Sequence, residues 1–156
     1  MIQAITESTF KAVVQTLDNQ IPIGDNYYYI WKFSNDMGGQ LQYAYARKQD
    51  VFNRYGNFYF DYNLVPDVFT GKVDLVAGYW KYEVYQVTWD DGITIAQDYA
   101  PITENDILLP PAGSKGVVRG LITKGKMYVS EKAGTEQITY NQHQSPTGTN
   151  YIWNGQ

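Results

Sequence analysis

The stretch that decides the fold is YYYIWKF, residues 27–33. Its side chains alternate, so that one side of an extended chain carries Tyr27, Tyr29, Trp31 and Phe33. Side chains of a β-strand point to its two faces in turn, so this pattern predicts a strand with one aromatic, buried face. The residues that follow, NDMGG at 35–39, tolerate positive φ and predict a hairpin loop.

The return strand of this hairpin is predicted at residues 41–47. Leu41, Tyr43 and Tyr45 lie on one face of it, and alanines and glutamines lie on the other. We expect the aromatic side chains of the hairpin to share one buried face. The opposite, mixed face would then meet water or a partner.

The same alternation continues along the rest of the chain and predicts strands at residues 10–17, 58–62, 73–89, 117–122, 126–131 and 137–140. Gly78 interrupts the longest of these and suggests a bulge or bend. A turn at 90–92 would let residues 93–95 pair back, and Lys124-Gly125 would separate two strands. Residues 49–55 are polar enough for a loop or a single helical turn.

These seven to nine strands predict an all-β fold, a single antiparallel β-sandwich or barrel. The 156 residues fit one domain, which we place at residues 1–143, with an irregular loop at 97–114 and an extended C-terminal arm at 144–156. The 15 tyrosines, 4 tryptophans and 6 phenylalanines suit the half-buried surface of a sheet.

Composition also restricts the partners that we expect. The net charge is −4 and the basic residues are scattered, which argues against nucleic acid. No apolar run approaches the roughly 20 residues that cross a bilayer, so we expect no membrane contact. The first residues, MIQAITE, do not resemble a signal peptide, which predicts synthesis in a cytoplasm.

Candidate catalytic and metal-binding residues are few. The chain has no cysteine and a single histidine, His143, so we expect neither a nitrogen- or sulfur-ligated zinc site nor a Cys–His pair. A carboxylate pair for glycoside hydrolysis would have to come from Asp61, Glu83, Asp90 or Asp91, and nothing in the sequence pairs them. We therefore expect no enzyme activity, no cofactor and no metal.

Two segments are the predicted partner contacts. The loop at 97–114 is long for a compact domain and contains Pro110 and Pro111. The C-terminal arm carries Tyr151, Ile152 and Trp153, and such a cluster implies docking on its own domain or on another chain. An excess of aromatic residues also fits a carbohydrate-binding module, in which case the exposed rings would be Trp89, Tyr99 and Trp153.

Three motifs resemble a known group of proteins. They are NYYYIWKFSND at 26–36, GYWKYEVY at 78–85 and GKMYVSE at 125–131, the last followed by Tyr140 and a terminal YIWNG. In this order they resemble small virion proteins of tailed phages of Bacteroidetes, among them the crAss-like phages. Residues 90–115 match nothing in that group.

The resemblance implies an immunoglobulin-like sandwich that acts as an auxiliary capsid protein. Such a protein would decorate the surface of the phage head, bind the major capsid protein or other virion proteins, and have no catalytic residues. A head-fibre base, a neck component and a module that binds host-surface glycans remain as alternatives.

Overall fold

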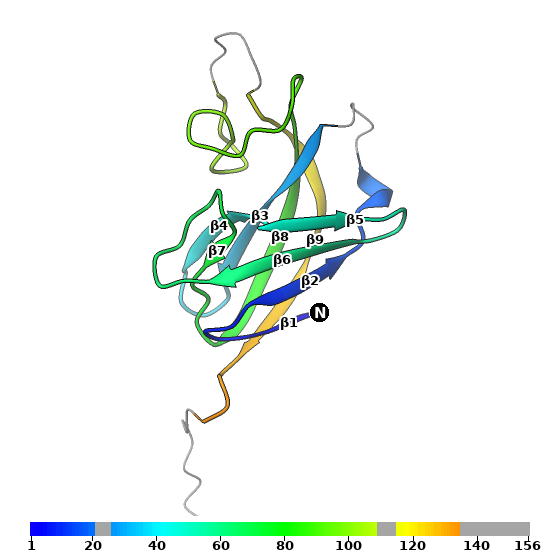
Figure 1. Cartoon of the computed structure of the whole chain (residues 1–156). Coiled ribbons are helices and arrows are strands. Elements are labelled where there is room, and N and C mark those ends of the chain that lie inside the picture. The colour runs from blue at the N-terminus through cyan, green and yellow to red at the C-terminus, as the bar shows by residue number, and fades with distance from the viewer. Residues whose placement is uncertain (21–25, 109–114, 135–156) are drawn as a thin grey trace, which may run out of the picture.

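The chain folds into two stacked β-sheets (Figure 1). The structure is a computed structural model that describes residues 1–20, 26–108 and 115–134. Within these residues there are nine strands and one short 3-10 helix, η1 (Leu17–Asn19). No helix in this part of the chain is long and apolar enough to cross a membrane. The all-β fold predicted from the sequence is therefore confirmed, its two sheets are compatible with the predicted sandwich, and the strand count lies inside the expected range. The prediction of purely antiparallel pairing was wrong, because two strand pairs run parallel.

The larger sheet has five strands in the order β1-β9-β8-β3-β4. They are β1 (Ile2–Ile5), β9 (Val117–Ser130), β8 (Gly78–Thr88), β3 (Tyr27–Asn35) and β4 (Leu41–Tyr45). All neighbours are antiparallel except β1 and β9, which run parallel. The first and last strands of the described chain therefore lie side by side at one edge.

The smaller sheet contains β2 (Phe10–Val14), β6 (Gly56–Tyr62) and β5 (Lys48–Val51), with β6 in the centre. The two-residue strand β7 (Lys72–Val73) pairs in parallel with the end of β6. This sheet lies in front of the larger one in Figure 1.

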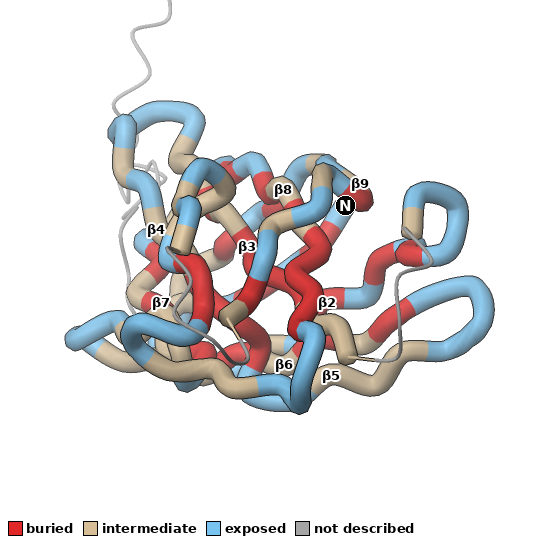
Figure 2. The backbone as a smooth tube through the Cα atoms, turned by 90° about the horizontal axis from the view of Figure 1, so that it is seen from above, coloured by how far each residue is buried: buried red, intermediate tan, exposed pale blue. Residues whose placement is uncertain are grey.

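Aromatic side chains fill the space between the two sheets. Trp31 of β3 is fully buried, and its ring lies 5.1 Å from Phe58 and 5.3 Å from Phe60 of β6 (centroid distances). Phe33 and Trp80 are buried as completely. Figure 2 shows these buried segments in the middle of the molecule, with exposed loops around them. Tilted and edge-on ring pairs of this kind stabilise a core by about 0.5–1.5 kcal/mol each beyond the area that they bury.

The hairpin of β3 and β4 corrects one prediction. Trp31 pairs with Ala44, and Lys32 pairs with Tyr43, so the tyrosines of β4 do not share a face with Trp31. Six residues separate the paired positions Ser34 and Leu41, and this loop length sets the register. As a result Ala44 of β4 faces the core, and the two tyrosines of this strand lie on the outer face of the sheet.

Several other local predictions were wrong. Residues 117–130 form one continuous strand, and not two strands separated by a turn at Lys124-Gly125. Gly125 is needed for packing: an added Cβ there would lie 2.6 Å from the Tyr82 hydroxyl group, so glycine leaves room for that side chain. Part of segment 49–55 is strand β5, residues 93–95 are not in a strand, and β1 was not predicted. The predicted strand at 137–140 and the arm at 144–156 lie outside the described residues.

Candidate interaction surface

A long loop covers the upper part of the outer face of the larger sheet, the face turned away from the smaller sheet. We call residues 90–108 the cover loop; it lies at the top of Figure 1. Beneath it a second hydrophobic cluster is buried, which contains Ile30, Tyr45, Val87, Trp89 and Ala100. Ile30 alternates with the core residues of β3 and so points outward. The cover loop, together with Val68 and Phe69 of a second loop, shields these outward side chains from water.

Trp89, at the entry to the cover loop, fastens the loop. Its indole Nε1 donates to the carbonyl oxygen of Tyr99 at 3.2 Å, and the same oxygen accepts from the Gly116 amide at 2.7 Å. Gly116 packs so closely on the indole that an added Cβ would lie 2.8 Å from it. The Trp89 side chain is only 3% exposed, so it offers no ring face to a partner or a sugar. The sequence-based prediction of Trp89 as a surface contact is therefore corrected.

A polar cluster anchors the middle of the cover loop to the sheet. Glu104 accepts a hydrogen bond from Lys32 Nζ of β3 at 2.6 Å and another from the Tyr43 hydroxyl of β4. Lys32 Nζ also lies 3.4 Å from Glu83 of β8, and Glu83 accepts from the Tyr85 hydroxyl at 2.8 Å. One loop carboxylate is thus bonded directly to β3 and β4 and is connected to the adjacent strand β8 through Lys32. The buried hydroxyl group of Tyr45, on β4, donates to the carbonyl oxygen of Pro101 in the same loop at 2.7 Å.

The pKa values of these groups follow from the contacts. Burial, and after it the hydrogen bonds to Glu104 and Glu83, raise the pKa of Tyr43 and Tyr85 to about 12. Burial alone would raise the pKa of Glu104, but the hydrogen bonds from Lys32 and Tyr43 outweigh it and lower this pKa. The hydrogen bond to Glu104 raises the pKa of Lys32. The cluster is therefore held in its charged, fully bonded form around neutral pH.

The cluster brings together two carboxylates, Glu83 and Glu104, through the shared Lys32. A glycosidase acid needs a raised pKa to hold its proton, whereas the pKa of Glu104 is lowered. Another carboxylate candidate, Asp61, is joined to Arg47 at 3.0 Å. The contacts of Glu83 and Glu104 suit anchoring of the cover loop.

Apolar side chains point away from the anchored loop into solvent. Ile107 is 87% exposed, and Ile93, Tyr99 and Ile102 are each between 41% and 46% exposed. An open hollow of about 330 Å³ lies between residues 104–108 and the start of β9 at Val117 and Val118. The loop therefore combines firm anchoring with an apolar outer surface.

No protein-family model, curated protein or solved structure matches this chain.

The structure describes only some of the predicted contact residues. Tyr99 is exposed on the cover loop as expected, and its carbonyl group is the acceptor that ties the loop together. Pro110, Pro111, Tyr151, Ile152 and Trp153 lie outside the described residues, as does His143. Sequence reasoning missed Ile102 and Ile107, although isolated isoleucines in the polar segment ITENDI (102–107) were a visible signal.

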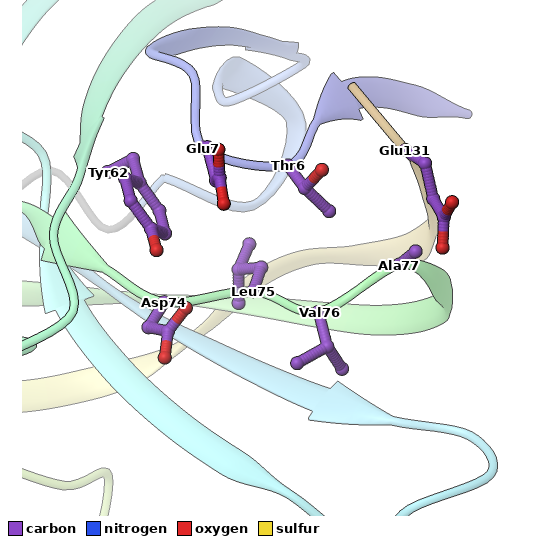
Figure 3. A pocket seen from close by; sticks show the side chains of 8 residues that line it. All are labelled: Thr6, Glu7, Tyr62, Asp74, Leu75, Val76, Ala77 and Glu131. Carbon is purple, nitrogen blue, oxygen red and sulfur yellow. The ribbon is translucent and has the colours of Figure 1, made fainter. Parts of the chain in front are cut away.

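A second hollow, of about 250 Å³, lies at the opposite end of the sandwich (Figure 3). Leu75, Val76 and Ala77 form its apolar side, with carboxylates of Glu7, Asp74 and Glu131 around it. Figure 3 shows Glu131 on the far side from Asp74. Among the residues that the structure describes, no three His, Cys, Asp or Glu side chains are grouped so that they could hold a metal ion.

Proposed function

We propose that this protein is a non-enzymatic virion structural protein, an auxiliary capsid protein with an immunoglobulin-like sandwich that decorates the phage head. The observation that carries the proposal is the cover loop, which is bonded to β3 and β4, is connected to β8 through Lys32, and exposes apolar side chains. A contact element that is already ordered loses little conformational entropy when it binds. Exposed apolar side chains on such an element are suited to a protein neighbour.

The resemblance to phage virion proteins supports the proposal in a specific way. The three motif segments, 26–36, 78–85 and 125–131, overlap β3, β8 and the second half of β9. These strands are direct neighbours in the larger sheet, in the order β9-β8-β3. The motifs are therefore adjacent parts of one sheet, which is the arrangement expected if they describe a shared fold.

A capsid lattice suits a small protein of this kind, because it repeats the same binding site many times. Contacts by the cover loop and by the predicted C-terminal arm would act together, and two linked weak contacts give much higher overall affinity than either alone. The expected partner is the major capsid protein, and the expected location is the capsid surface after synthesis in the host cytoplasm. A head-fibre base or a neck component would use the same surface on a different neighbour.

The test is co-sedimentation of the purified protein with phage heads that lack it. We expect saturable binding at a fixed ratio to the major capsid protein. Ile107→Asp should weaken this binding by about tenfold or more, because burial of an aspartate against an apolar neighbour costs over 1.4 kcal/mol. The matched control is Leu64→Asp, a side chain that is 75% exposed on a different loop and should bind normally.

A version truncated after Gln144 tests the arm in the same assay. Loss of binding on truncation places one anchor in residues 145–156. If the full-length protein does not bind heads, the capsid proposal is wrong, and isolated necks and tails become the next binding partners to examine.

A further inference from the structure

The lower part of the outer face of the larger sheet is not covered by the cover loop. Glu104 reaches as far as the row in which Lys124, Glu83, Lys32 and Tyr43 lie side by side across four strands. The next row contains Lys126, Lys81, Ser34 and Leu41, and the row below it contains Gln3, Tyr128 and Tyr79. We call the residues of these two lower rows the open strip.

The open strip carries an exposed pair of aromatic rings. Tyr79 and Tyr128 are direct partners across β8 and β9, with ring centroids 4.9 Å apart. They are 54% and 37% exposed, although most of the aromatic side chains of this sheet are buried in one of the two clusters. Cross-strand ring pairs add some stability to a sheet, but this pair also presents a contiguous aromatic surface to solvent.

Lysines lie directly beside the two rings. Lys81 and Lys126 are opposite each other in the ladder, and Lys124 follows two residues away on the same face. Like charges in direct opposition destabilise a strand pair. Lys81 Nζ lies 2.9 Å from a carboxylate oxygen of Asp36, which offsets part of this repulsion. In the described part of the chain neither Lys124 nor Lys126 has an ion-pair partner. Residues that are far apart in the sequence thus form a small basic patch on a protein of net charge −4.

The exposed ring pair and the lysines beside it are suited to a ligand that has both rings and negative charges. A pyranose ring presents C–H groups to the negative face of a tyrosine ring, and a uronate carboxylate pairs with an ammonium group. Asp36 and Glu83 border the lysines, so the patch also offers acceptors for sugar hydroxyl groups. Three lysines are few for a nucleic acid, which is bound through many phosphate contacts. We propose that the open strip binds an acidic polysaccharide, with uronate rings on Tyr79 and Tyr128 and carboxylates on Lys126 and its neighbours.

The proposal does not depend on the capsid function. It also differs from the sequence-based interpretation of a glycan site, which relied on Trp89, Tyr99 and Trp153. Of those, Trp89 is buried, and Tyr99 lies on the cover loop, apart from the open strip.

The experiment is isothermal titration of the full chain with short oligomers of galacturonate, mannuronate, guluronate and hyaluronan. Neutral malto-oligosaccharides and oligothymidylate are the comparison ligands. We expect binding of at least one uronate oligomer, and about tenfold or greater loss in the double variant Tyr79→Thr and Tyr128→Thr. The variant Tyr79→Phe with Tyr128→Phe keeps both rings and should keep most of the affinity. Lys126→Gln should weaken binding and reduce its salt dependence.

Matched controls come from the other sheet, where Lys48 lies 5.4 Å from the centre of the Tyr59 ring. Lys48→Gln and Tyr59→Thr should leave binding unchanged. The proposal is overturned if no uronate oligomer binds, or if the open-strip and control variants lose affinity equally. Equal binding of oligothymidylate, insensitive to loss of the tyrosine rings, would show general anion attraction and would also overturn it. Circular dichroism of each variant identifies a loss of binding that is due to unfolding.

Discussion

The link between Glu104 and the sheet leads to a quantitative prediction. Glu104→Gln keeps the size of the side chain and removes its charge. The glutamate accepts from the Lys32 ammonium group at 2.6 Å and from the Tyr43 hydroxyl, and the Lys32 and Glu104 side chains are only 23% and 15% exposed. Glutamine offers one neutral acceptor oxygen in place of two anionic ones, so one of the two hydrogen bonds is lost and the other loses its charged acceptor.

The expected cost follows from these two contacts. A hydrogen bond to a charged group contributes about 1.5–3 kcal/mol and a neutral one about 0.5–1.5, so most of the cost comes from the hydrogen bond that is lost. The free energy of unfolding should fall by about 2 kcal/mol in total. For a domain of this size that corresponds to a decrease in Tm of about 4–8 °C. Lys32 keeps Glu83 as a partner at 3.4 Å, which prevents a larger loss.

Urea unfolding followed by tryptophan fluorescence measures this change. The control is Asp50→Asn, which breaks the pair of Asp50 with Lys48 at 3.1 Å, where the lysine side chain is 62% exposed. Such exposed pairs contribute about 0–1 kcal/mol. If Glu104→Gln costs no more than Asp50→Asn, the polar cluster does not anchor the cover loop as we infer.

Three further predictions concern pH and packing. Because the pKa of Glu104 is lowered in the folded state, its contribution to the free energy of unfolding is complete above the unfolded carboxyl pKa of about 4.3. That contribution is lost as pH falls through the folded pKa. Glu104→Gln should therefore lose less stability than the parent protein on acidification, as measured by urea titrations. Tyr43 and Tyr85, with pKa values of about 12, should remain un-ionised at pH 10–11 in absorbance titrations of the folded protein. The free energy of unfolding should fall as pH rises above about 10, because tyrosines of the unfolded chain ionise there. Gly125→Ala places a methyl group where a tyrosine hydroxyl lies 2.6 Å from the ideal Cβ, so thermal unfolding should show a loss of about 1–3 kcal/mol. Gly38→Ala, with its nearest contact at 3.5 Å, should change stability by less than about 0.5 kcal/mol, and an equal effect at both glycines would contradict this packing argument.

The sequence predicted those parts of the fold that depend on local alternation. The strands that begin at Tyr27, Gly56 and Gly78 contain clear stretches of alternation, and these three strands were located. Register was not predictable in the same way, because it depends on how many residues the hairpin loop contains between paired positions. The aromatic residues of β4 were therefore assigned to the wrong face.

Glycine was the second source of error. Gly125 and a turn glycine look identical in a sequence, but the reason for Gly125 is a tyrosine on the facing strand, 43 positions earlier in the chain. The residues of the candidate surface are likewise brought together from distant parts of the chain. Lys32 and Glu104 are 72 residues apart, and the lysines of the open strip lie on two different strands. No local pattern contains such pairings, so only the chemical character of the loop at 97–114 was foreseen.

The parallel pairing of β1 and β9 has a mechanical consequence. Ile2 lies opposite Met127 and Ile5 lies opposite Ser130, and the Thr6 amide donates to the Ser130 carbonyl just beyond the ladder. A pulling force that enters the chain before Ile2 and leaves it after Ser130 drives these two strands along each other in opposite directions. All the hydrogen bonds of the ladder are then strained at once, whereas in a hairpin pulled at its open end they would break one after another. The domain should therefore transmit tension between its two ends with little extension, until the β1–β9 pair gives way in a single step.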